Sequence, residues 1–385
     1  MNYHVISTAA ALKEYLVSIA GEKYIALDTE FMREKTFFAQ LCLVQIATSK
    51  GAAIVDILSP ALGDATLLWE FLEEDHRVKI FHSASQDLEI IYHIRNKLPP
   101  NVIDTQIMGA VLGLGDNIGY QKLVEYFLKK DLDKTMQYTN WALRPLSKKA
   151  LDYAALDVIY LFEISHMMEK QLQQQHRQEW VKEEMKKLLN VDTYKLAPEI
   201  AWQRLKKFPK SAKKFRALQL MAEWREHTAI ERDLPRGFVI RDELLFEIAN
   251  HLPKNEKEMS TIRNISSLLN HKKNLEAVLA IIRRVQGEPL PPHVEEKEQY
   301  QWESSHDNAL EVLKLLLKIT ARRQAVAARI VARESDLIDF LLHKPSPQIM
   351  SGWRYDVFGK NAEKLLQGKL SLRLQGNEIE FIEVA

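Results

Sequence analysis

Cysteine is nearly absent from this sequence, because its 385 residues include only Cys42. A single cysteine excludes an internal disulfide and is typical of a reducing compartment. No apolar run approaches the roughly 18 residues that a membrane-spanning helix needs, and the N-terminus lacks the basic start of a secretory signal. We therefore expect a cytoplasmic protein in which Cys42, between Leu41 and Leu43, is a packed strand residue.

The chain also lacks a surplus of charge of either sign, since 53 Lys and Arg residues balance 52 Asp and Glu residues. The two halves differ, however. Residues 1–200 carry 22 basic and 27 acidic side chains, whereas residues 201–385 carry 31 and 25. An acidic site in one half and a basic surface in the other suit a polyanionic substrate, although halves this close to neutral do not establish one.

The first half alternates short apolar runs with helical patterns. Strands are predicted over 23–31, 40–47, 52–56, 78–81 and 102–104, with helices over 65–74 and 85–93. The turn at Ser49 to Gly51 indicates that the second and third strands are antiparallel. This order predicts an α/β core, a mixed sheet flanked by helices. Ligand sites in such sheets gather at the strand ends.

Two acids, Asp28 and Glu30, end the first apolar run. A strand's period of two directs both side chains to the same face. Two converging carboxylates repel each other and are costly to bury unless a cation lies between them. A solvated loop with both acids facing water is the alternative, and for an isolated Asp-x-Glu it is the commoner outcome.

A third acid, Asp87, stands in the first turn of the helix predicted after the fourth strand, with Ser85 as a candidate N-cap. An acid at that position also offsets the helix dipole, which is a structural alternative to metal binding. Neighbouring His82 is expected to be a packed or hydrogen-bonded histidine, because no second histidine stands at metal-ligand spacing.

A fourth acid, Asp157, interrupts the apolar stripe of a long helix that is predicted to begin near Lys148. Tyr153 lies one turn earlier on the same face. No Lys or Arg occurs between Ala150 and Glu169, so the helix itself offers this carboxylate no counter-charge. A metal ion, or a partner elsewhere in the fold, is required.

Four acids, Asp28, Glu30, Asp87 and Asp157, thus form an all-oxygen set that suits Mg²⁺ or Mn²⁺. Two such ions roughly 3.5 to 4 Å apart can clamp an in-line displacement at phosphorus. Tyr153 is placed to orient the attacking water, and an unperturbed tyrosine titrates too high to act as a free base. No Ser-His-Asp or Cys-His set competes with this chemistry.

These residues, in this order, resemble the three exonuclease motifs of the ribonuclease D family, in the tyrosine branch of the DEDD superfamily. The matching segments are Asp28 to Phe31 with Arg33, Thr36 and Phe37; His82 and Asp87; Trp141 to Ser147; and Tyr153 with Asp157. The resemblance implies a ribonuclease-H-like fold, two divalent metals, release of nucleoside 5′-monophosphates from RNA 3′ ends, and trimming of tRNA. It makes the four acids metal ligands and Tyr153 the residue that positions water.

The resemblance extends to the second half, where two all-α helical bundles are expected after the core. The predicted boundaries are 1–190 for the exonuclease domain, 191–209 for a linker, 210–288 for a helicase-and-RNase-D C-terminal domain, 289–300 for a proline-rich linker and 301–385 for a divergent second copy. Arg241 to Leu244 and Arg333 to Leu337 carry the matching start signals.

Candidate RNA contacts fall in two groups. Near the acids they are Phe31, Arg33 and His82, with Phe37 and Phe38 as further stacking candidates. A basic run that contains no acid supplies Arg204, Lys206, Lys207, Lys210, Lys213 and Lys214. An ordinary solvated face is the alternative for any one of these charges.

The prediction is a monomeric, metal-dependent 3′-to-5′ exoribonuclease that acts on tRNA precursors with 3′ extensions. A DNA exonuclease of proofreading type would carry the same four acids, because only contact with the 2′-hydroxyl separates the two sugars. A noncatalytic RNA-binding scaffold would be favoured by loss of one metal ligand, and none is missing.

Overall fold

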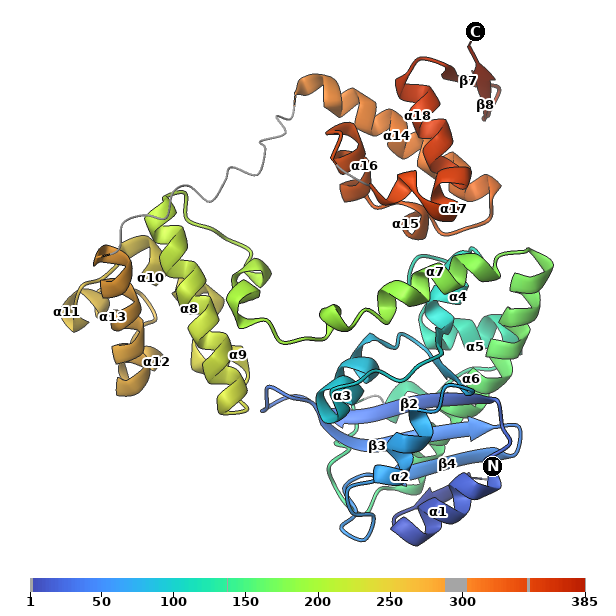
Figure 1. Ribbon diagram of the computed structural model, residues 1–385, viewed down its shortest axis with the longest axis horizontal. Coiled ribbons are helices and arrows are strands. Elements are labelled where there is room, and N and C mark those ends of the chain that lie inside the picture. Colours follow the sequence, from blue (N-terminus) through green and yellow to red (C-terminus); the bar gives the residue numbers. More distant parts are fainter. Residues whose placement is uncertain (1–2, 137, 288–302, 345–346, 385) are drawn as a thin grey trace. The chain divides into compact units, whose positions relative to one another are not determined.

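The computed structural model describes residues 3–136, 138–287, 303–344 and 347–384 (Figure 1). It separates into two compact units. Unit 1 comprises the described residues within 1–30, 43–190 and 300–385, and unit 2 those within 31–42 and 191–299. The predicted linker at 289–300 lies outside the described residues. In the part of the chain that is described, no helix has the length and apolarity to span a membrane.

A mixed six-stranded sheet forms the centre of the N-terminal part, in the order β1-β4-β3-β2-β5-β6. Strands β1 and β4, β2 and β5, and β5 and β6 pair in parallel, whereas β3 and β4 are antiparallel. The strands are β1 Tyr3–Ile6, β2 Tyr24–Met32, β3 Gln40–Thr48, β4 Gly51–Asp56, β5 Val78–Phe81 and β6 Val102–Asp104. The expected α/β core is confirmed.

Helices flank this sheet, with α2 in front of it and α6 behind it in Figure 1. Val158 and Leu161 of α6 pack against small and apolar strand residues such as Ala26 and Ile80. The Ser147 hydroxyl caps α6 by accepting a hydrogen bond from the Ala150 N–H at 3.1 Å. The helices are α1 Ala9–Ser18, α2 Thr66–Leu72, α3 Ser85–Arg95, α4 Thr105–Val111, α5 Tyr120–Leu128, α6 Lys148–Gln174 and α7 Gln178–Leu188.

Unit 2 is a helical bundle with its own apolar core. Its main helices are α8 Ala212–Glu231, α9 Arg236–Val239, α10 Asp242–His251, α11 Glu256–Met259, α12 Ser266–Leu269 and α13 Lys272–Gly287, preceded by the 3-10 helix Pro198–Arg204. Phe37 is 3% exposed in this core. The Asp233 carboxylate accepts hydrogen bonds of 2.9 Å from the N–H groups of Phe37 and Phe38, which fasten segment 31–42 to the bundle.

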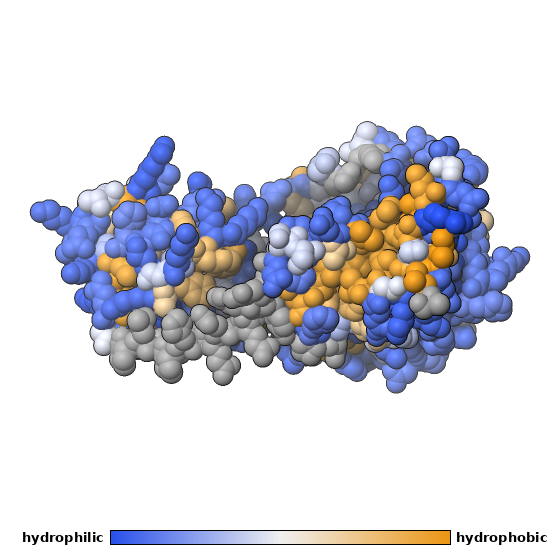
Figure 2. Space-filling model, turned by 90° about the horizontal axis from the view of Figure 1, so that it is seen from above, coloured by the Kyte–Doolittle hydropathy of each residue, from blue (hydrophilic) through white to orange (hydrophobic). Residues whose placement is uncertain are grey.

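A second helical bundle, residues 303–384, belongs to unit 1, and we call it the C-terminal lobe. It contains α14 Ser304–Arg323, α15 Ala328–Val331, α16 Glu334–Leu341, α17 Gly352–Arg354 and α18 Lys360–Leu366, followed by a hairpin of β7 Leu370–Gln375 and β8 Glu378–Glu383. The sequence did not predict this hairpin. Figure 2 shows one face of the molecule, where mostly hydrophilic side chains surround one larger apolar area on the right.

Several element ends differ from expectation. The strand β1 and helix α1 were not predicted. Ser85 is the first residue of α3 and not its N-cap, because the Asp104 carboxylate accepts the hydrogen bonds of the Ser83 and Ala84 N–H groups at that turn. Asp242 begins α10 and forms an ion pair of 2.5 Å with Arg225. The residues after Pro235 form the short helix α9.

Candidate active site

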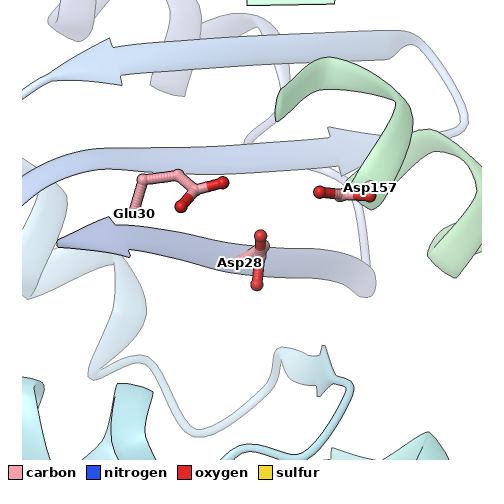
Figure 3. A group of neighbouring side chains, drawn as sticks. All are labelled: Asp28, Glu30 and Asp157. Carbon is pink, nitrogen blue, oxygen red and sulfur yellow. The ribbon is translucent and has the colours of Figure 1, made fainter. Parts of the chain in front are cut away.

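Three carboxylates from two elements converge beside the sheet. Asp28 and Glu30 leave the same face of β2, as the strand period predicts, and Asp157 comes from α6. Figure 3 shows the three side chains pointing toward one another. They offer oxygen atoms that all lie within 4.8 Å of each other, the one such group of metal-ligating residues found among the described residues.

Asp87 lies close to this group without belonging to it. It is buried in the first turn of α3 and accepts a short hydrogen bond from the Thr29 hydroxyl. Burial, and then the charge of Asp28, hold the pKa of Asp87 well above its usual range. The structure therefore brings the fourth acid within electrostatic reach of Asp28, through a pairing with Thr29 that the sequence did not indicate.

Burial and mutual repulsion raise the pKa values of the three converging acids. Burial, followed by the charge of Asp157, raises the pKa of Asp28 to about 8. Burial, followed by the charge of Asp28, raises the pKa of Glu30 to about 10. Burial also raises the pKa of Asp157 to about 7, against a hydrogen bond from Tyr153 that lowers it. Such a set is unfavourable without positive charge, which a hard divalent cation supplies.

Tyr153 lies where the sequence placed it, one turn before Asp157 and hydrogen-bonded to it. Burial, and then the Asp157 charge, raise the pKa of the Tyr153 hydroxyl, so it stays protonated and can donate a hydrogen bond. Its ring stacks on buried Trp141, with the ring centroids 6.3 Å apart and the planes inclined by 27°. Trp141 therefore fixes the orientation of this tyrosine.

Arg144 holds the loop that carries Trp141. Its Nε and Nη2 bind the two Asp56 carboxylate oxygens at 2.8 and 2.6 Å, and its Nη1 donates to the carbonyls of Trp141 and Leu143 at 2.6 and 2.8 Å. Asp56 ends strand β4. The segment from Trp141 to Ser147 thus connects the end of β4 to Tyr153, a role that the sequence alone did not reveal.

Tyr120, at the start of α5, was also missed. Its hydroxyl donates a short hydrogen bond to the backbone carbonyl of Asp157. No local pattern marks this residue, because the bond joins positions 37 apart. A pocket of about 500 Å³ opens here, lined by residues 114–122 together with Leu132, Asp133, Tyr153 and Asp157. It provides space for a substrate group directly beside the acids.

His82 is hydrogen-bonded within the fold, as the sequence predicted for a histidine that binds no metal. Its Nδ1 lies 3.0 Å from the Thr105 hydroxyl, and its ring lies 5.4 Å from that of Tyr120. Burial lowers the pKa of His82, which favours the neutral ring. Phe31 and Arg33, both half-buried, belong to unit 2. Core packing accounts for Phe37.

The basic run divides into exposed and engaged side chains. Lys206, Lys207 and Lys210 are exposed. Arg204 is also exposed but pairs at 2.7 Å with Glu226, which is 1% exposed, and Lys213 donates to the Gln286 carbonyl at 3.0 Å. Lys214 is half-buried in the first turn of α8. The three exposed lysines are the members of this run whose charges face solvent most fully.

Comparison with known proteins identifies both parts of the chain. A family model described as 3′-5′ exonuclease matches residues 3–173, and one described as HRDC domain matches residues 214–282. The first of these ranges contains the acids, Tyr153 and the segment from Trp141 to Ser147.

Curated relatives match along nearly the whole chain. Ribonuclease D of Sphingobium indicum is 37% identical over 98% of this chain and 98% of its own length, and ribonuclease D of Jannaschia sp. is 36% identical over 99% and 100%. Among solved structures, Escherichia coli RNase D, described as an exoribonuclease involved in structured RNA processing, superposes with a TM-score of 0.83 at 28% identity, covering 96% of this chain and 99% of that one.

Proposed function

Since the chain belongs to the ribonuclease D family, we propose that Asp28, Glu30, Asp87 and Asp157 hold the divalent metal ions on which its 3′-to-5′ hydrolysis of RNA depends. The observation that carries this proposal is the convergence of Asp28, Glu30 and Asp157 oxygens within 4.8 Å in a half-buried site. We assign two ions, Mg²⁺ or Mn²⁺, because hard all-oxygen ligand sets with substrate phosphate suit these metals.

The reaction breaks the last phosphodiester bond of the RNA. A water oxygen bonds to phosphorus, the 3′ oxygen of the preceding nucleotide leaves and is protonated, and the products are a nucleoside 5′-monophosphate and an RNA shortened by one nucleotide. When bound, the metal ions polarise the attacking water and stabilise the charge that develops on the leaving oxygen.

Side chains of the protein itself orient the attacking water and restrain the groups around it. Tyr153 keeps its proton because of burial and the neighbouring Asp157 charge, and its hydroxyl is placed to orient the water. Trp141 restrains the tyrosine ring, and Tyr120 restrains the backbone at Asp157. The pocket beside the acids accommodates the terminal nucleotide. Preorganised groups of this kind lower the barrier because they need not reorient during the reaction.

We infer that the physiological substrates are tRNA precursors with 3′ extensions, on the strength of the family relationship and of the accessory helical domain matched at 214–282. Lys206, Lys207 and Lys210 supply the exposed positive charge that phosphate contact requires. A monomeric state and a cytoplasmic location remain predictions that rest on the sequence alone.

The test is incubation of the purified protein with a tRNA that carries a short 3′ extension, and with RNA and DNA oligonucleotides of one sequence. The expected result is stepwise shortening of the extension with release of 5′-mononucleotides, restored by Mn²⁺ or Mg²⁺ after EDTA has stopped it. Equal hydrolysis of DNA would favour the proofreading-type alternative. No hydrolysis of any of the three in either metal would contradict the proposal.

A further inference from the structure

One continuous segment, residues 114–122, supplies most of the wall of the catalytic pocket. It follows α4, runs into the first turn of α5 and includes Tyr120, whose hydroxyl donates to the Asp157 carbonyl. Within the exonuclease core the Gln106 side chain fastens it by donating to the Ile118 carbonyl at 3.2 Å. The position of this wall therefore affects both the space for the substrate and the backbone that carries a metal-site carboxylate.

The C-terminal lobe contacts this segment and the end of α4 that precedes it. The Ala327 N–H donates to the Ala110 carbonyl at 2.9 Å, and the Arg329 N–H donates to the Asp116 carboxylate at 2.7 Å. Both bonds use backbone N–H groups, which are fixed by the lobe's own fold. They attach the lobe to the last turn of α4 and to the middle of the pocket wall.

Arg177 makes a third connection between α4 and the C-terminal lobe. Its Nη1 donates to the Val111 carbonyl of α4 at 2.9 Å and to the Ala325 carbonyl of the lobe at 3.0 Å, and its Nη2 donates to the Gln324 carbonyl. One guanidinium thus joins the end of α4 to the end of α14. Beyond it, Trp180 and Trp353 stack with centroids 4.3 Å apart, and Arg354 pairs with Glu183 and Glu184 at 3.1 and 2.5 Å.

Gly113 shows how closely the two parts approach. Its φ is +77°, and a Cβ placed there would lie 2.5 Å from the Ala325 carbonyl oxygen. The obstacle is backbone and not a flexible side chain, so the wall or the lobe would have to shift. The lobe is therefore in close contact with Gly113, the residue that immediately precedes the pocket wall.

We propose that the C-terminal lobe is a positioning element of the active site: by gripping residues 110–116 it sets the wall that holds the 3′-terminal nucleotide. This inference rests on the proposed function, because it assigns the terminal nucleotide to the pocket beside the acids. The lobe then acts on a single bound nucleotide, and not only by holding distant parts of the RNA.

Gly113→Ala is the direct test, with Gly63→Ala as its matched control. Gly63 has a φ of +72°, so alanine costs a similar backbone strain there, yet a Cβ at Gly63 would meet nothing within 4 Å. With oligoadenylate as the substrate, we measure KM, kcat and the inhibition constant of the product adenosine 5′-monophosphate, which reports on binding of the terminal nucleotide without the rest of the RNA. Circular dichroism and the Mn²⁺ concentration for half-maximal rate check the fold and the metal site.

Gly113→Ala is expected to raise both KM and the inhibition constant on the order of tenfold, because a binding site must hold its geometry to about 0.5 Å, while the Mn²⁺ midpoint stays unchanged. Gly63→Ala is expected to leave both constants unaltered. A raised KM with an unaltered inhibition constant would overturn the proposal, because the lobe would then act through the RNA. Failure of adenosine 5′-monophosphate to inhibit the unsubstituted protein would overturn it as well.

Arg177→Ala repeats the test without backbone strain and is the deciding variant if Gly113→Ala does not fold. Its control is Arg323→Ala, which removes a guanidinium that donates to the Ile379 carbonyl and lies over Phe381, all within the lobe. The Arg177 variant should raise the inhibition constant and the Arg323 variant should not. Equal behaviour of the two would contradict the proposal, whereas an unsubstituted protein that hydrolyses no RNA would refute the proposed function instead.

Discussion

At the scale of single residues, the site gathers buried acids whose mutual repulsion is relieved by bound protons in the metal-free protein and by a cation when one binds. Asp28, Glu30 and Asp157 are carboxylic acids whose pKa values burial and mutual repulsion raise to about 8, 10 and 7. Without metal the folded protein holds protons on these groups that the unfolded chain releases near their ordinary values of about 4. Stability and metal binding are therefore linked through pH.

The first prediction is that metal-free protein loses stability as the pH rises. Because the folded-state pKa values are raised, the stabilising contribution of these acids is complete below about pH 4 and is lost as the pH passes through about 7 to 10. Melting temperatures measured in EDTA between pH 5 and pH 9 should fall more steeply for the unsubstituted protein than for Asp28→Asn. Added Mn²⁺ should raise the melting temperature more at pH 9 than at pH 5. Parallel curves for the two proteins would contradict this.

The second prediction concerns the tyrosine hydroxyl. Tyr153→Phe keeps the ring that stacks on Trp141 but removes the group that is placed to orient water, so kcat should fall on the order of tenfold or more with little change in melting temperature. Tyr160→Phe, on the same helix with its ring under Lys130, serves as the control. Steady-state hydrolysis of RNA measures both. Equal rates for the two variants would remove Tyr153 from the mechanism.

The sequence predicted most of these residues, because period-two and period-3.6 patterns encode which side chains share a face. Asp28 with Glu30, and Tyr153 with Asp157, are local pairs of this kind, and both pairs are found as expected. The bond from Thr29 to Asp87 joins residues 58 apart. No local pattern encodes such a distance, and only the folded sheet creates it.

At the scale of elements, the loop before α6 connects the sheet to the catalytic helix. The paired hydrogen bonds from Arg144 to Asp56 anchor this loop to the end of β4, while Trp141 packs on Tyr153. A guanidinium can make both bonds at once and a lysine ammonium cannot reproduce that geometry. The orientation of Tyr153 thus depends on a residue that touches no reacting atom.

The third prediction follows from these contacts. Arg144→Lys should lower kcat on the order of tenfold while the metal concentration for half-maximal rate stays unchanged, since the carboxylates are undisturbed. Arg95→Lys is the control, because Arg95 pairs with Glu73 at 2.9 Å on the far end of α3. A shifted metal midpoint in the Arg144 variant would show that the loop supports the ligands and not the tyrosine.

Element ends were harder to predict than the elements themselves. The strands from β2 to β6 and the long helix α6 have strong periodic patterns, and they form as predicted. Ser85 was a candidate N-cap in the sequence, but the Asp104 carboxylate accepts the N–H hydrogen bonds at that turn instead. The energy of a cap is small enough that one long-range hydrogen bond changes the outcome.

At the scale of the whole molecule, the division into compact units does not follow the order of segments along the chain. Segment 31–42, which runs from the end of β2 to the start of β3, groups with the bundle of residues 191–287, while the C-terminal lobe groups with the exonuclease core. The motifs that carry the family resemblance predicted that helical bundles would form in the second half of the chain. They could not predict which unit each segment joins, because that depends on contacts such as those of Asp233 and Arg177 over long sequence separations. The predicted domain boundaries therefore remain predictions.

The most direct test of the central claim uses an RNA labelled with ³²P at its last phosphodiester bond. With Mn²⁺ or Mg²⁺, the protein should release the label at once as nucleoside 5′-monophosphate, and EDTA should stop the release. Asp157→Asn should abolish the release while remaining folded. Asp152→Asn, on the same helix but paired with Lys148, should retain it. Release by Asp157→Asn at the unsubstituted rate, or in EDTA, would contradict the assignment of a carboxylate metal site.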